Sequence, residues 1–286
     1  GKNYTISLVA PGREDDEFLI YSISDTDTNQ RTSIKHVTMS SNSFHLISGI
    51  NSSSETNNRK KGMIMCINMI DESSILIGYE SGEISVYDLE NKTCTSIAIG
   101  HAESVLCMDF AVHKVIKDKV VNTNATARKS HYQFRGFSGG ADSLLVVYKL
   151  CQRTLNLNIQ NKIKIPFKGI ADIKIRRHHF IEATNYKYKI VLCACWDGKV
   201  RIYGFKNVRL LASLSYHEGS VYNISCPYYI PCRDDNQTSR GVNTKDSSDS
   251  NFKKDFKYGL FATSGKDGRI ACWELYGDNY NKKIKV

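Results

Sequence analysis

The sequence lacks any apolar run approaching the roughly 18 residues that a membrane-spanning helix needs. Its first residues also form no apolar signal segment, so nothing marks the chain for secretion. These absences predict a soluble, intracellular protein with no membrane partner.

Paired-cysteine motifs are missing as well. The chain has 9 cysteines, an odd number, and none are spaced as Cys-x-x-Cys. Most lie within apolar runs, which predicts buried, reduced thiols in a cytosolic or nuclear compartment. The cysteines are at positions 66, 94, 107, 151, 193, 195, 226, 232 and 272.

Motifs for phosphate and metal binding are also absent. The glycines of residues 137–141 have no following lysine, so they do not form a phosphate-binding loop. The neighbours His178 and His179 lack metal-ligand spacing, as do Cys193 and Cys195, which we expect in the core of a strand. Because Arg176 and Arg177 precede the two histidines, this segment is predicted to be an exposed basic tip that binds a partner.

Apolar and basic residues are what the chain has in quantity. Hydrophobic residues make up 41% of the sequence and aromatic residues 10%, enough for a sizeable core in one large domain. Lysine and arginine outnumber the acids by 39 to 29, a net charge of +10. This charge is dispersed, which favours a solvated surface or an acidic protein partner over nucleic acid.

A repeated unit runs along the chain. Each copy starts with a turn residue, usually Asp followed by Gly, continues through apolar or β-branched residues and ends on an aromatic residue. Another apolar run precedes each turn, so turn and runs predict a β-hairpin. The copies are residues 81–87, 142–148, 197–203 and 267–273, with a weaker one at 15–21.

Two copies are preceded by a matched segment in which a histidine, His101 or His217, comes four residues before a strand-opening valine. A further apolar run follows the aromatic, as in residues 208–213, so each unit holds about four strands. The histidine, the Asp turn and the closing aromatic dipeptide, such as Tyr87-Asp88 or Trp273-Glu274, resemble the WD repeat. This resemblance implies an all-β fold, the β-propeller, built from four-stranded blades.

The closing aromatics lie 55 to 70 residues apart, longer than the about 40 to 45 residues of an ordinary blade. Polar insertions at residues 51–61, 117–129 and above all 231–256 account for the difference. We expect one propeller domain, 1–286, with blades at 1–58 (partial), 59–100, 101–160, 161–215 and 216–286, and a disordered insertion near 231–257. The first unit begins at its second strand, so we expect these to be the C-terminal five blades of about seven.

Polar residues recur at fixed places in two units, and in WD repeats such sets form a buried hydrogen-bonded relay. Losing one member is expected to cost about 1 to 3 kcal/mol. The two other complete units carry Cys193 and Pro166, or Ile77 and Lys60, at the hydroxyl and histidine positions, which predicts that they rely on packing alone. The relay residues are His101, Ser138, Asp142 and Tyr148 in one unit, and His217, Thr263, Asp267 and Trp273 in the other.

The competing interpretation of these residues is a Ser-His-Asp hydrolase with Ser220 or Ser104 as nucleophile. The sequence has no nucleophile elbow, and the histidines and aspartates recur as repeat positions. The structural role therefore explains them better, and we expect no catalytic site, metal site or cofactor.

Three stretches resemble one WD-repeat family in order and spacing: residues 7–13, residues 61–67 with 77–82, and residues 211–217 continuing to 264–276. It is the G-protein-beta-like family, whose fungal members are the ASTRA-associated proteins. The resemblance implies a non-enzymatic adaptor of the ASTRA assembly, linked to chromatin remodelling and to the co-chaperones that mature phosphatidylinositol-kinase-related kinases. It further implies a nuclear and cytoplasmic protein, monomeric within a hetero-complex.

Two alternatives remain open on the sequence. One is a nucleic-acid-binding propeller that uses Arg176, Arg177, His178 and the lysines near residue 253. The other is a substrate receptor of a ubiquitin ligase, because a propeller fold alone implies only that the protein binds other proteins.

Overall fold

The computed structural model describes residues 5–26, 31–46, 61–117, 130–176, 189–226 and 260–275. Within them the regular structure is β-strand, apart from the short 3-10 turn Ser41–Ser43. No helix in these ranges is both long enough and apolar enough to cross a bilayer. The three predicted insertions lie outside the described residues, except for Lys61 and Lys117 at their ends.

The strands form five sheets, ordered β1-β2-β3, β4-β8-β7-β6-β5, β12-β11-β10-β9, β13-β14-β15-β16 and β17-β18-β19. In chain order the strands are β1 (Thr5–Pro11), β2 (Glu17–Thr26), β3 (Arg31–Ser40), β4 (His45–Leu46), β5 (Ile64–Met69), β6 (Ser74–Tyr79), β7 (Glu83–Asp88), β8 (Thr93–Ile99), β9 (Val105–Lys117), β10 (Ser130–Gly140), β11 (Leu144–Cys151), β12 (Leu157–Lys164), β13 (Ile170–Arg176), β14 (Ile190–Cys195), β15 (Lys199–Gly204), β16 (Leu210–Ser215), β17 (Val221–Ser225), β18 (Leu260–Gly265) and β19 (Ile270–Glu274).

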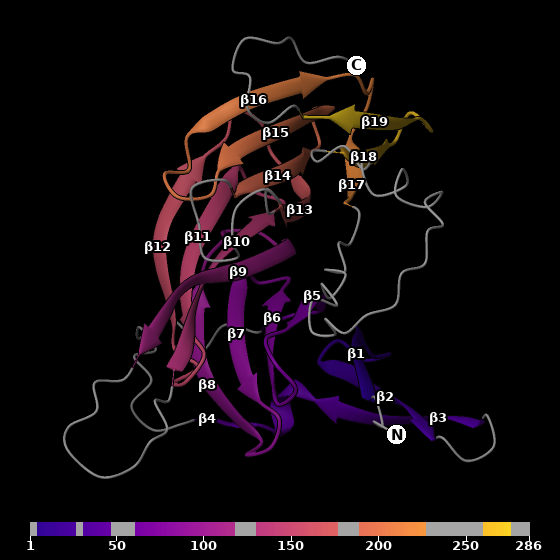
Figure 1. Cartoon of the computed structure of the whole chain (residues 1–286), viewed down its shortest axis with the longest axis vertical. Coiled ribbons are helices and arrows are strands. Elements are labelled where there is room, and N and C mark those ends of the chain that lie inside the picture. Colours follow the sequence, from indigo (N-terminus) through magenta and orange to yellow (C-terminus); the bar gives the residue numbers. More distant parts are fainter. Residues whose placement is uncertain are drawn as a thin grey trace, which may run out of the picture.

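Successive sheets are arranged side by side around a common axis. β5 contacts β9, β9 contacts β13, and β13 contacts β17, so the first strands of neighbouring sheets line the inside of the arc. Figure 1 shows this arc running from β1–β3 through β5–β12 to β17–β19. The predicted all-β propeller fold is confirmed.

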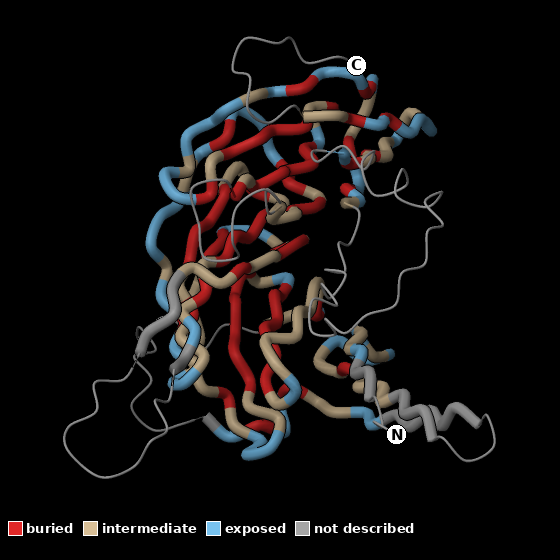
Figure 2. Tube along the Cα trace, viewed as in Figure 1, coloured by how far each residue is buried: buried red, intermediate tan, exposed pale blue. Residues whose placement is uncertain are grey.

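The core consists of layers between neighbouring sheets. Phe137 and Leu145 of one sheet pack against Ile173 and Cys193 of the next, all four fully buried. Each such apolar side chain stabilises the fold by about 1.5–3 kcal/mol. Figure 2 shows buried residues along the inner and middle strands, whereas the outer strands β12 and β16 are largely exposed.

Polar side chains on the inner strands bind the backbone of the next sheet. Asn68 Nδ2 donates to Met108 O at 3.1 Å. Asp109 Oδ2 accepts from Ile175 N at 2.6 Å, and Asp172 Oδ2 accepts from Ile224 N at 2.9 Å. Four successive sheets are therefore joined by directional bonds as well as by apolar packing.

The outer edge of the second sheet carries an extra strand. β4 pairs in parallel with β8, with His45 opposite Thr93 and Leu46 opposite Cys94. An edge strand has unpaired backbone groups to which another chain can bind, and β8 has no charged residue to discourage such pairing. β4 covers the end of this edge.

Candidate functional site

Asp142, Asp197 and Asp267 lie in the turns between the second and third strands of three successive sheets. We call these turns the Asp corners. In each, the carboxylate accepts a hydrogen bond from the backbone N–H two residues later, with the partners Leu144 (3.1 Å), Lys199 (3.4 Å) and Arg269 (3.2 Å). The three aspartates thus have equivalent positions in the fold.

The corner of Asp267 begins a continuous buried relay. Trp273 Nε1 donates to Thr263 Oγ1 at 2.8 Å, and Thr263 Oγ1 lies 2.9 Å from His217 Nε2. His217 Nδ1 lies 3.0 Å from Asp267 Oδ1. Because an ionised carboxylate only accepts, an imidazole with one proton carries it on Nδ1, and Nε2 then accepts from the threonine hydroxyl. The hydroxyl oxygen accepts in turn from the indole N–H, so the aspartate sets the direction of the bonds.

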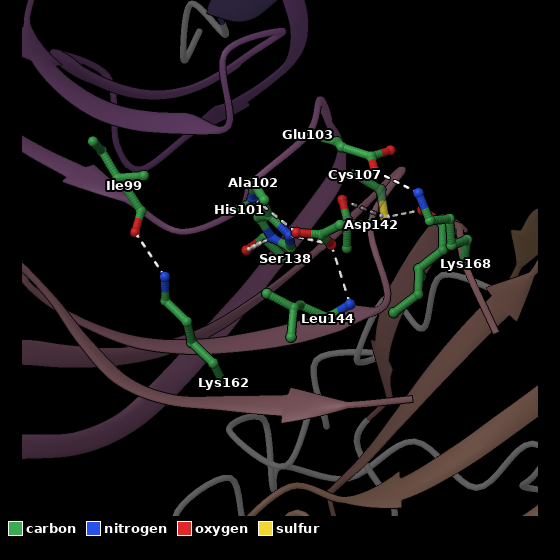
Figure 3. A network of polar contacts seen from close by, with 12 residues as sticks. Ile99, His101, Ala102, Glu103, Cys107, Ser138, Asp142, Leu144, Lys162 and Lys168 are labelled. Carbon is green, nitrogen blue, oxygen red and sulfur yellow. Dashed lines mark hydrogen bonds and ion pairs between the residues drawn. The ribbon is translucent and has the colours of Figure 1, made fainter. Parts of the chain in front are cut away.

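The corner of Asp142 repeats most of this arrangement (Figure 3). His101 Nδ1 lies 2.9 Å from Asp142 Oδ1, and His101 Nε2 lies 2.9 Å from Ser138 Oγ. Asp142 Oδ2 also accepts from the backbone N–H of Ala102 at 2.9 Å. Histidine, hydroxyl and aspartate are all buried, so the network ties three strands together away from solvent.

The prediction that Tyr148 belongs to this relay is wrong. Its hydroxyl is buried and has no hydrogen-bond partner. The ring instead lies across Gly136, where a Cβ would come within 2.0 Å of Tyr148 Cε2. The physical reason is that a phenol carries its only polar atom at the far end of the ring, whereas the indole N–H of Trp273 lies on the side of its ring and reaches the hydroxyl.

Tyr148→Phe is therefore expected to raise the free energy of unfolding by about 1 kcal/mol, because it removes a buried hydroxyl that has no partner. The matched control is Tyr87→Phe. The Tyr87 hydroxyl lies 2.7 Å from that of Tyr79, so its loss should destabilise the protein by about 1 kcal/mol. Urea denaturation of both variants measures the difference, and destabilisation by Tyr148→Phe would contradict the structure.

The third corner uses an arginine in place of the histidine. The two terminal guanidinium nitrogens of Arg201, Nη1 and Nη2, donate to Asp197 at 2.8 and 2.6 Å, and the two side chains are only 4% and 8% exposed. The prediction that this sheet relies on packing alone is wrong. The signal that could have found the pair is an arginine at the centre of the apolar strand of residues 199–204.

The second sheet has a different polar network at the same end, which again corrects the prediction of packing alone. Lys61 Nζ donates to Tyr87 OH at 2.9 Å and lies 3.4 Å from Glu83 Oε1. Ser85 Oγ donates to Glu83 at 2.5 Å. The comparison of repeats placed Lys60 opposite the histidines, whereas the structure uses the next residue, Lys61, in this network.

The geometry gives no support to a nucleophilic serine. Both ring nitrogens of His217 are engaged by Asp267 and Thr263, and Ser220 Oγ donates instead to Trp196 O at 2.9 Å. Ser104 contributes its backbone oxygen, which accepts from Ala141 N. The two His–Asp pairs also belong to different sheets, β9–β12 and β17–β19, rather than to one cleft.

Within the described ranges no group of three His, Cys, Asp or Glu side chains could hold a metal ion. Cys193 and Cys195 are buried on β14, and burial raises the pKa of Cys195 to about 11. All eight cysteines of these ranges are free thiols, and Cys232 lies outside them. Buried thiols such as those of Cys193 and Cys195, whose pKa is raised, are unreactive.

Of the predicted basic tip only Arg176 is described, at the end of β13. Its side chain interacts with Cys226 of the neighbouring sheet, at the end of the sheet opposite the Asp corners. Arg177, His178, His179 and the lysines near residue 253 lie outside the described residues.

The Asp corners predict acid destabilisation. Burial opposes ionisation, but hydrogen bonds from His217 and Glu218 lower the pKa of Asp267 to about 2. The pKa values of Asp142 and Asp197 are also lowered, against burial, by His101 and Arg201. Unfolded aspartate titrates near pH 3.9, so this stability is present above about pH 4 and is lost as the pH falls towards about 2.

Urea midpoints measured from pH 5 downwards test this expectation. Burial raises the pKa of Asp109, so protonation of that residue stabilises the folded state and works in the opposite direction. With three lowered groups against one, we expect a net loss of stability, with a smaller slope in Asp267→Asn. Unchanged midpoints between about pH 4 and pH 2.5 would contradict it.

Comparisons with known proteins agree with this fold. No protein-family model matches the chain. Guanine nucleotide-binding protein subunit beta-like protein 1 of Mus musculus is 27% identical over 223 residues, 76% of this chain and 50% of that protein. ASTRA-associated protein 1 is 23% identical in Schizosaccharomyces japonicus, over 76% of this chain and 48% of that protein. In Aspergillus flavus it is 23% identical, over 75% and 51%.

The chain thus spans about half the length of the curated relatives it matches. Among solved structures, the computationally designed Ika4 protein aligns with a TM-score of 0.46 and 14% identity, over 77% of this chain and 95% of that one. WD-repeat propellers of this kind are generally scaffolds without enzymatic activity. The repeated corners, the sheet topology and these relatives together identify the chain as a WD-repeat β-propeller protein similar to the G-protein-beta-like and ASTRA-associated proteins.

Proposed function

We propose that this protein is a non-enzymatic scaffold that associates with the ASTRA assembly in nucleus and cytoplasm. Its role there would be chromatin remodelling and the co-chaperone-assisted maturation of phosphatidylinositol-kinase-related kinases. The observation that carries the proposal is similarity over about 76% of the chain to proteins named for ASTRA association and for G-protein beta subunits.

The geometry supports a scaffold because its polar residues are used to hold the sheets together. The Asp corners, the relay and the bonds between sheets all engage polar groups inside the protein. The loops between the strands are then left to bind partners. They are held at fixed positions on a rigid frame, and such loops are the usual binding elements of these folds. Protein partners, rather than a small ligand or cofactor, fit this arrangement.

Affinity purification of the full chain followed by mass spectrometry tests the proposal. We expect ASTRA and kinase-maturation co-chaperone subunits to be recovered, and to be retained after nuclease treatment. Recovery that disappears with nuclease would favour nucleic-acid binding. Recovery of a ubiquitin ligase without ASTRA subunits, or of no partner at all, would overturn the proposal.

A further inference from the structure

Three large aromatic side chains are exposed at the end of the sheets that carries the Asp corners. Phe167, in the loop between β12 and β13, is 55% exposed. Trp196, in the turn between β14 and β15, is 39% exposed, and Tyr216, between β16 and β17, is 41% exposed. Tyr216 packs edge-on against the buried Trp273, with ring centroids 6.2 Å apart, but all three rings leave a large apolar surface to solvent. Several large exposed aromatics at one end of a protein are typical of a protein-binding surface.

The loops that carry these rings contact one another. Trp196 N donates to Gly169 O at 3.0 Å, and Ser220 Oγ donates to Trp196 O at 2.9 Å. The Trp196 ring lies directly on Gly169, where a Cβ would come within 2.0 Å of Trp196 Cδ2. Gly198, next in this turn, lies against the backbone of His217. The indole is thus fixed on one side and exposed on the other, and little conformational entropy is lost when a partner covers it.

The charges around the rings are unbalanced in favour of lysine. Glu103 and Glu218 pair with Lys168 and Arg269 at 2.7 and 2.8 Å. The other acids of these loops are the three corner aspartates, which bind His101, Arg201 and His217. Three further lysines flank the aromatic loops and form no salt bridge in the described ranges, although the charge of Lys199 also acts on Asp197. They are Lys164 before the Phe167 loop, Lys199 after the Trp196 turn and Lys266, whose backbone N–H binds Ser220 O.

We infer that Phe167, Trp196 and Tyr216, with Lys164, Lys199 and Lys266, form an aromatic-lysine surface that docks an acidic segment of a partner protein. The segment inserts one or more apolar side chains beside Trp196 and places its carboxylates near the lysines. This inference rests on the proposed scaffold function and deepens it, because it names a surface and the chemistry of its partner.

A protein segment fits this surface better than a nucleic acid does. Strong phosphate-backbone binding uses about 6–10 cationic contacts, whereas this surface offers three unpaired lysines. An acidic peptide with an apolar anchor needs only the rings and a few cations.

Selection of a phage-displayed library of random peptides of about twelve residues tests the inference. Wild-type protein serves as bait, and Trp196→Ala removes peptides that bind elsewhere. Enriched peptides are expected to carry net negative charge and at least one Leu, Phe or Trp. Their affinity should fall about tenfold or more in Trp196→Ala and Phe167→Ala, as for central interface aromatics, and also in Lys164→Glu/Lys266→Glu.

Tyr132→Ala is the matched control, because Tyr132 is 42% exposed but lies at the opposite end of β10. It should keep the affinity within about twofold, well below the effect of a central aromatic. Thermal melts show which variants fold, and Phe167→Ala keeps the test decisive should Trp196→Ala unfold.

Enriched peptides without acidic bias would overturn the inference, as would peptides that bind both alanine variants as tightly as the wild type. Displacement of the peptides by oligothymidylate, with tighter binding of the oligonucleotide, would assign the surface to nucleic acid instead. Affinity purification with Trp196→Ala separates the two levels of proposal. Unchanged recovery of partners refutes the surface and leaves the scaffold standing, whereas no recovery even by the wild type refutes the scaffold itself.

Discussion

Arg201→Ala is expected to lower the free energy of unfolding by about 3 kcal/mol, because it leaves the buried carboxylate of Asp197 without its counter-charge. The arginine is 3% exposed and binds both carboxylate oxygens of Asp197. Burial raises the cost of an unpaired charge far above its cost on a surface. Chemical denaturation measures the loss directly.

Two variants show whether burial and geometry cause this effect. Arg201→Lys keeps the charge but loses the two-pronged contact, so its loss should be intermediate. Arg269→Ala breaks the exposed pair with Glu218 and should cost no more than about 0.5 kcal/mol. If Arg201→Ala were as mild as Arg269→Ala, the buried pair would not stabilise the third corner.

Gly136→Ala is expected to destabilise the protein by about 3 kcal/mol, at the upper end of the cost of overpacking. A Cβ at this position would lie 2.0 Å from Cε2 and 2.2 Å from Cζ of Tyr148. The tyrosine is fully buried between neighbouring strands, so it has no empty space into which to move. Thermal and urea unfolding measure the loss.

Gly100→Ala is the control, because the nearest atom to its Cβ would be the terminal Cδ1 of Ile84, at 3.0 Å rather than 2.0 Å. A double variant, Gly136→Ala/Tyr148→Leu, should be more stable than the two single losses added together, by about 1 kcal/mol or more. Strict additivity would show that the ring of Tyr148 is not what excludes a side chain at residue 136.

Most of the fold could be predicted from the repeated Asp turns in the sequence. An Asp-Gly pair opening an alternating strand fixes a hairpin locally, so the topology follows from spacing. The His–Asp contacts were predictable for the same reason, because residues at matched repeat positions come together once the hairpins form. β4 was not predictable, because two residues are too few to show a periodicity.

The remaining corrections come from chemistry that only three-dimensional placement reveals. Arg201 lies on β15, whereas the histidines precede the first strand of their sheets, so alignment of repeat positions does not show the replacement. Tyr148 keeps the aromatic body of Trp273 but moves the polar atom to the tip of the ring, which breaks the relay. The cluster of Phe167, Trp196 and Tyr216 is spread over three loops and forms only when the sheets pack.

The bonds from Asn68, Asp109 and Asp172 to the main chain of the following sheet bear on how the protein comes apart. In a repeat protein, stability divides between each unit and its coupling to its neighbours. These side chains add to the coupling between sheets, so unfolding of one sheet removes stabilising contacts from the next. The arc should therefore unfold in one cooperative transition. A partner that binds two adjacent sheets would then stabilise all the coupled sheets.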